Sequence, residues 1–125
     1  MKRTTMYEDE IQEGDRHFLA IYLETKNACM VLLSEGEDQM GTLAVAIPSL
    51  SHETTPYLSS VLMGDRYITT ARMFAERLAA KINKIGLVSI YLKTISEGEA
   101  VPILLRLFDK VTQRKPVAGP EGIQI

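Results

Sequence analysis

The longest periodic pattern of apolar positions lies between Arg66 and Ile85. Apolar residues recur there at steps of three and four, the spacing of one helix face, at Ile68, Ala71, Phe74, Ala75, Leu78, Ala79, Ile82 and Ile85. Asp65 can cap the first turn with its carboxylate, and Gly86 can end the last turn in a left-handed conformation. The pattern predicts one long amphipathic α-helix.

Four apolar runs precede this helix and predict four β-strands, at about residues 17–23, 28–34, 40–47 and 57–63. The polar turn of residues 24–27 joins the first two strands into a hairpin. Both faces of these two strands are largely apolar. This predicts a sheet that is covered on each side, or on one side by the chain itself and on the other by a second subunit.

The third predicted strand has two different faces. Its bulky side chains are Leu43, Val45 and Ile47, and its small ones are Thr42, Ala44 and Ala46. Because successive strand residues point to opposite sides, the small residues share one face. We expect the long helix to approach that face closely.

A fifth strand at residues 87–92 and a second helix at about residues 100–114 follow Gly86. Pro102 fits the first turn of that helix, where its missing N–H costs nothing. Ile103 and Leu107 widen the apolar arc of the helix to roughly 200°. We expect a symmetric homodimer in which a second copy of the chain covers these two residues or pairs with a strand edge.

The order of predicted elements is β-β-β-β-α-β-α. It indicates an α+β fold with five to six mainly antiparallel strands, in one sheet or two small ones, and two helices. A single domain is expected at residues 16–115. A flexible arm is expected at residues 1–15, where charged side chains follow no period, and a flexible tail at residues 116–125, which hold two prolines and two glycines.

Composition limits the class of protein. The chain has 125 residues, of which 46% are hydrophobic and 24% are charged, and its net charge is -2. That charge argues against general binding of nucleic acid, and no apolar run approaches the roughly 20 residues of a membrane span. The only cysteine, Cys29, lies in an apolar run and leaves no internal disulfide. We expect a cytoplasmic protein.

Motifs that carry chemistry are missing from the sequence. It contains two histidines, His17 and His52, and lacks zinc, phosphate-loop and dinucleotide-binding patterns. The acidic residues Glu35, Glu37 and Asp38 lack the spacing of a calcium loop and predict a solvated turn. Residues 49–53 contain serine, histidine and glutamate, but neighbours in one loop rarely form a triad. We expect no catalytic residue, metal site or cofactor.

The outward side of the long helix is rich in cations. It carries Arg66, Thr70, Met73, Arg77, Lys81 and Lys84. A solvated charged face is one interpretation. The other is a docking surface for an acidic protein partner, formed by all of these residues except Thr70. The polar loop at residues 49–55 is an alternative surface.

Several local matches resemble the small proteasome assembly chaperones of types three and four. They are Met40-Gly41-Thr42-Leu43, Pro48-Ser49, residues 59–65 (SSVLMGD), residues 75–79 (AERLA), Asn83-Lys84 and Leu87-Val88-Ser89-Ile90. The resemblance spans residues 16 to about 113. It implies a non-catalytic, homodimeric, archaeal form of a chaperone that acts on the α-ring of the 20S proteasome, with a proteasome α-subunit or an assembly intermediate as its partner.

The last three residues differ from a docking motif of the larger chaperones in that pathway. Those proteins end in a hydrophobic residue, tyrosine and any residue, whereas this sequence ends in Ile123-Gln124-Ile125. The glutamine argues against docking by the tail. Two other hypotheses remain open at this stage. One is a dimeric scaffold of the roadblock or longin type, and the other is a small enzyme or ligand-binding protein with a pocket near His52 and Asp65.

Overall fold

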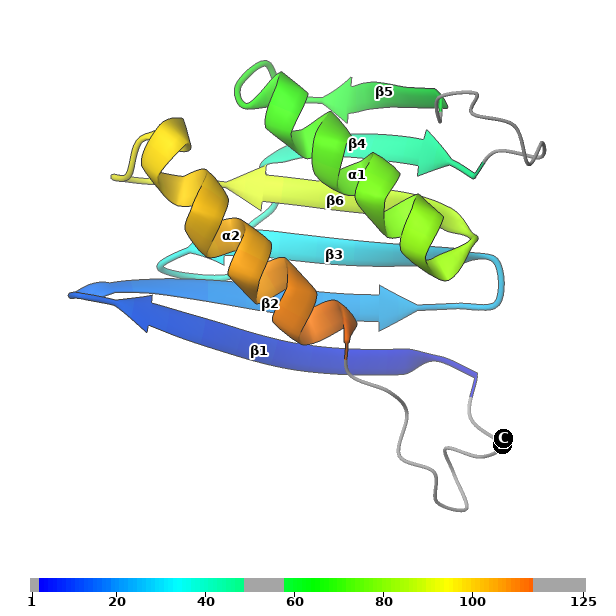
Figure 1. Cartoon of the computed structure of the whole chain (residues 1–125), viewed down its shortest axis with the longest axis horizontal. Helices are drawn as coiled ribbons and strands as arrows, with labels where there is room; N and C mark the ends of the chain where they lie inside the picture. The colour runs from blue at the N-terminus through cyan, green and yellow to red at the C-terminus, as the bar shows by residue number, and fades with distance from the viewer. Residues whose placement is uncertain (1–2, 49–57, 114–125) are drawn as a thin grey trace.

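The computed structural model of the chain describes residues 3–48 and 58–113. Within them lie six strands and two helices (Figure 1). In chain order they are β1 (Thr5–Glu13), β2 (Arg16–Glu24), β3 (Ala28–Glu35), β4 (Thr42–Ile47), β5 (Leu58–Met63), α1 (Ile68–Ile82), β6 (Ile85–Tyr91) and α2 (Glu97–Thr112). The predicted α+β class with two helices and a mostly antiparallel sheet is confirmed.

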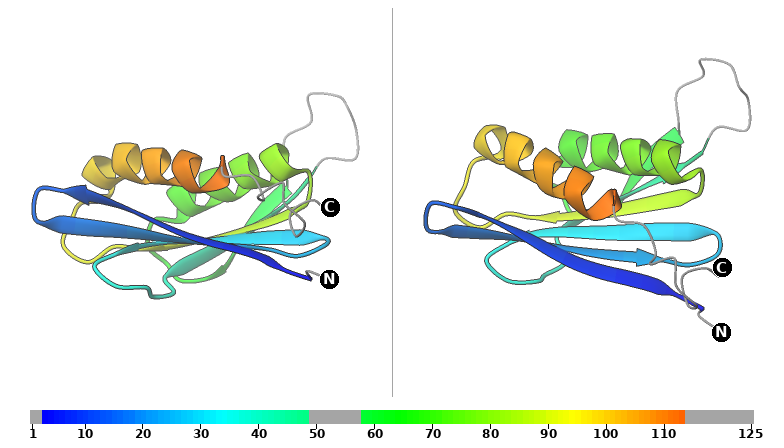
Figure 2. Two further views of the ribbon diagram at one scale, coloured as in Figure 1. Left: turned by 90° about the horizontal axis from the view of Figure 1, so that it is seen from below. Right: turned by 60° about the horizontal axis from the view of Figure 1, so that its bottom comes forward.

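All six strands form one sheet, in the order β1-β2-β3-β6-β4-β5. Neighbouring strands pair antiparallel, except that β3 and β6 run parallel. Strand β6 is late in the chain but central in the sheet, between β3 and β4. Both helices lie on the same side of the sheet, as the two views of Figure 2 show. Helix α1 covers β4, β5 and β6, and α2 covers β1 and β2.

The core fills the space between the helices and the sheet. Its largest fully buried side chains come from both layers and include Phe18, Val31, Leu33, Phe74, Leu78, Val88, Leu104 and Phe108. The rings of Phe74 and Phe108 stack with their centroids 5.4 Å apart and join α1 to α2. Burial of such side chains is the main force that holds α1 and α2 against the sheet.

Small residues let α1 approach the sheet closely. Ala44 and Ala46 of β4 are fully buried, as are Ala75 and Ala79 of α1. A Cβ atom added at Gly86 would lie 2.9 Å from both Ala75 O and Ala79 N. The prediction of a small-residue strand face under the long helix is confirmed.

The prediction of a flexible arm at residues 1–15 is wrong for Thr5–Glu13, which form edge strand β1. Tyr7 and Ile11 face the helix layer and pack against the core. The intervening acids are paired with α2: Lys110 Nζ lies 3.1 Å from Asp9 Oδ1, and Arg106 Nη2 lies 2.7 Å from Glu13 Oε2. Paired charges therefore replace apolar residues on half of this strand face. The predicted tail at residues 116–125 lies outside the described residues.

Both predicted ends of the long helix are wrong. Asp65 does not cap α1: the N-cap residue is Tyr67, in the left-handed region at φ 57°, and there is no capping hydrogen bond from a side chain. The helix ends at Asn83, also left-handed at φ 55°, whose N–H bonds to Ala79 O. Gly86 lies inside β6, where the close packing of α1 leaves no room for a Cβ atom.

Helix α2 begins before the predicted start because Ser96 caps it. The Ser96 hydroxyl accepts a hydrogen bond from Glu99 N at 3.3 Å, as in a capping box. Leu107 is fully buried within the single chain, so its predicted place in a dimer interface is wrong. The wide apolar arc arises because α2 packs on the sheet and against α1. Ile103 is only partly buried.

Candidate functional site

The structure does not bring the five predicted partner-binding residues onto one free face. Lys84 lies beyond the end of α1, where its Nζ is 2.6 Å from Glu24 Oε2. Arg77 Nη2 lies 3.4 Å from Asp109 Oδ1 of α2. Thr70, on the same predicted side, is buried and donates a hydrogen bond to Glu97. Half of the predicted stripe therefore holds α1 in place.

Arg66, Met73 and Lys81 remain exposed, although they are spread along the molecule. The Arg66 guanidinium carbon lies 5.2 Å from the centre of the Tyr67 ring, in the turn before α1. Sequence reasoning missed another exposed cation, Arg72, whose Nε donates to Ser59 Oγ at 3.0 Å. Helical periodicity could not have predicted this hydrogen bond, because it links α1 to a residue of β5.

Residues that carried the family resemblance meet at one end of the sheet, where backbones pack tightly. A Cβ atom at Gly41 would lie 2.0 Å from Ile90 O, and the Gly41 N–H donates to Ser89 Oγ at 2.8 Å. Gly64 has φ +93° and would bring a Cβ within 2.6 Å of Thr42 Oγ1. Only glycine fits both constraints at Gly64. These glycines therefore have a structural role, because they allow the backbones to pack closely at this end of the sheet.

Glu35 was predicted in a solvated turn, but its side chain is buried, which corrects that prediction. Burial alone would raise the pKa of this carboxyl. Hydrogen bonds from the Thr94 hydroxyl and from the N–H groups of Lys93, Thr94 and Ile95 outweigh burial and lower the pKa to about 2. The carboxylate fixes the loop between β6 and α2.

The single cysteine is placed in the core under the helices. Cys29 is buried, and burial is the main cause that raises the pKa of its thiol to about 12. A thiol with that pKa is not a nucleophile near neutral pH. Tyr22, beside it, donates a hydrogen bond from its hydroxyl to Glu24 Oε1 at 2.7 Å, and burial also raises its pKa.

The sheet face opposite the helices carries apolar side chains on every strand, with Glu8 and Glu10 of β1 among them. We call it the open face. Its residues point away from the helices, because they alternate along each strand with buried residues or lie in register with residues that do. They are Met6, Leu19, Ile21, Leu23, Met30, Leu32, Val45, Ile47, Leu58, Met63 and Leu87. Every one is half-buried or exposed. No helix among the described residues covers this face (Figure 2).

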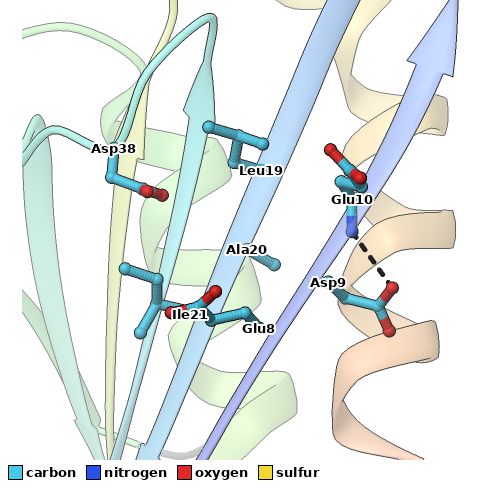
Figure 3. A pocket seen from close by; sticks show the side chains of 7 residues that line it. All are labelled: Glu8, Asp9, Glu10, Leu19, Ala20, Ile21 and Asp38. Atoms are coloured by element: carbon cyan, nitrogen blue, oxygen red, sulfur yellow. Dashed lines mark hydrogen bonds between the residues drawn. The ribbon is translucent and has the colours of Figure 1, made fainter.

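Near β1 the open face is bordered by acids. Figure 3 shows Leu19 and Ile21 of β2 beside Glu8 and Glu10 of β1, with Asp38 from the loop after β3 facing them. Together they line a hollow of about 300 Å³. The hollow is open, and its polar side chains are the carboxylates of Glu8, Asp9, Glu10 and Asp38, with no cationic side chain in its lining.

The other predicted sites involve His52, the loop at residues 49–55 and Asp65. His52 and the loop at residues 49–55 lie outside the described residues. Asp65 is exposed and lines a separate hollow of about 260 Å³ with Arg66 and Tyr67. Within the described ranges, no group of three or more histidine, cysteine or acidic residues could hold a metal ion, and neither helix could span a membrane.

Comparisons with known proteins give a family and a fold. Residues 17–92, more than half of the chain, match the sequence model of the family described as "Proteasome assembly chaperone 4". No curated protein is similar enough to count as a match. A chain from the crystal structure of a chaperone complex for yeast 20S proteasome assembly is similar in structure, with a TM-score of 0.66 at 15% identity. That match covers 89% of this chain and 94% of the yeast chain.

Proposed function

This chain belongs to the proteasome assembly chaperone 4 family, and we propose that it is a non-catalytic, cytoplasmic chaperone that binds proteasome α-subunits or assembly intermediates as a homodimer. The observation that carries the proposal is the family match, which extends over β2 to β6. The buried cysteine has a raised pKa and is not a nucleophile near neutral pH. Binding by surfaces is the activity that this arrangement supports.

The open face is our proposed dimer interface, in place of Leu107. Six strands, six to nine residues long and about 4.8 Å apart, cover roughly 700 Å² in projection. Stable complexes bury about 800 Å² of accessible surface per partner, so a corrugated face of this size is large enough. Two identical open faces, related by a two-fold axis, would pack as a sandwich of sheets and remove the apolar residues of both copies from water.

A dimer of this kind leaves the helix layers outward on both sides. The exposed cations Arg66 and Lys81 and the exposed Met73 then stay accessible for an acidic client. Arg77 and Lys84 are tied by ion pairs to Asp109 and Glu24 and contribute less. Contacts by a few charged side chains suit a chaperone that must later leave, since such contacts set association rate and specificity more than affinity.

Client binding is tested with recombinant proteasome α-subunits of the source organism. The purified protein and the α-subunits are mixed at low salt and separated by size, and we expect them to elute together. The variant with both Arg66→Glu and Lys81→Glu should bind at least about tenfold more weakly, because two favourable charges become repulsive. Lys26→Glu, in the exposed turn after β2, is the control. The proposal fails if the wild type does not bind any α-subunit.

The dimer is tested at the centre of the open face. Leu32→Asp places a charge where two sheets would meet and should give a folded monomer by light scattering. Thr69→Asp, on the exposed side of α1, should leave the dimer intact. A Leu32→Asp protein that remains dimeric would exclude the open face as the interface.

A further inference from the structure

The two edge strands of the sheet differ in their charged residues. Edge strand β1 contains four acidic residues among its nine, and two of them pair with α2. Edge strand β5, LSSVLM, contains no charged residue. Charges on an edge strand discourage the addition of another strand, and their absence leaves the backbone open to it.

Strand β5 offers both backbone groups and apolar side chains at its outer edge. Among the described residues it pairs with β4 alone, so alternate N–H and C=O groups of β5 have no strand partner. Leu58 is 75% exposed and Leu62 is 56% exposed. A β-bulge lies opposite Leu43 and Ala44, where Leu62 is the extra residue.

A cation is fixed beside this edge on the helix side. Arg72 Nε donates to Ser59 Oγ at 3.0 Å, and Ser59 in turn donates to Glu76. Arg72 itself is exposed and makes no ion pair with any residue in the described ranges. A carboxylate on an added strand would complement it, because an arginine held in one orientation binds a carboxylate well.

We infer that the free edge of β5 binds an extended segment of the client protein as an added strand. Main-chain hydrogen bonds to β5 hold the segment. Its apolar side chains lie against Leu62, which is exposed and is not part of the open face, and an acidic side chain reaches Arg72. Strand addition of this kind derives affinity from the backbone and specificity from alternate side chains. The inference rests on the proposed function and names the surface that it uses.

Amide hydrogen exchange on the complex with recombinant α-subunits tests the inference. The β5 amides that do not bond to β4 should exchange at least about tenfold more slowly in the complex. The amides of β1 are the internal control and should not change. A complex that forms while β5 exchange is unaltered, or while both edges slow equally, would overturn the inference and leave the proposed function standing.

Two further outcomes are decisive. If no α-subunit binds, the proposed function and the inference fail together. If the β5 amides that do not bond to β4 are already protected without α-subunits in the Leu32→Asp protein, in a way that depends on protein concentration, a second copy occupies the edge and the inference is wrong. Arg72→Glu should weaken client binding about fivefold to tenfold, whereas Lys26→Glu, the same charge change far from β5, should not. Equal effects of the two variants would remove Arg72 from the site.

Discussion

The two faces of the sheet are built from the same strands and differ in what covers them. On the helix side, Phe18, Val31 and Val88 are fully buried within the chain. Their neighbours Leu19 and Leu32, which point the other way, are only half-buried. Both sets are apolar. The apolar content of a strand thus indicates whether one or both of its faces must be buried. The connections between elements determine on which face of the sheet the helices pack.

The difference assigns separate roles to the two sides. The helix side completes its core with residues of one chain, and its stability is a property of the monomer. In the dimer that we propose, the open face completes its burial against a second copy of the chain. Substitutions on the two faces should therefore change different measurable quantities: the free energy of unfolding on the helix side, and the dimer dissociation constant on the open face.

The largest expected effect is on the helix side. Phe108→Ala removes a fully buried ring that stacks on Phe74, and should lower the free energy of unfolding by about 3–5 kcal/mol. Leu32→Ala, measured at concentrations low enough to dissociate the proposed dimer, should cost only about 1 kcal/mol because its side chain is partly in water. Urea denaturation measures both. Equal costs would contradict the division between the two faces.

An intermediate effect concerns the carboxylate that positions α2 on the helix side. The pKa of Glu35 is lowered from 4.5 to about 2 in the folded protein, so its charged form stabilises the fold. This contribution, at most ~3 kcal/mol, is complete above about pH 4.5 and declines as the pH falls toward 2. Glu35→Gln should flatten the dependence of stability on pH in that window. Glu37→Gln, at an exposed neighbour, should leave it unchanged.

The smallest expected effect is at the β1 edge. Lys110→Ala removes the ion pair to Asp9 and the hydrogen bond to Glu10 O. The lysine is half-exposed, so the loss in stability should be about 1 kcal/mol or less. Hydrogen exchange should quicken in Thr5–Glu13 and nowhere else. Faster exchange throughout the sheet would show that β1 is part of the cooperative core rather than its margin.

The sequence predicted the elements whose side chains follow a single period. Of the eight predicted apolar positions, Ala71, Phe74, Ala75, Leu78 and Ala79 form the buried stripe of α1 because all of them face one sheet, whereas Ile68 is 40% exposed and Ile85 lies in β6. Strand β1 was missed because acids replace apolar residues at alternate positions. The usable signal was Tyr7 and Ile11, four residues apart, with Asp9 between them on the same face.

The surface was much harder to predict than the core. Glu24 and Lys84 form an ion pair across 60 residues of sequence, and Ser59 meets Arg72 only because β5 lies under α1. Helical spacing places cations on a face but cannot show which are already paired. The wide apolar arc of α2 likewise indicated that the helix packs against two surfaces. One is the sheet, and the other is α1 of the same chain.

The central place of β6 has a consequence for the order of synthesis. The meander β1-β2-β3 and the hairpin β4-β5 meet only through β6, which is translated after all of them. At about 5–20 residues per second, both pieces leave the ribosome seconds before the strand that joins them. During that interval the inner edges of β3 and β4 are bare, and a nascent chain stalled before residue 85 would present two incomplete sheets to its neighbours.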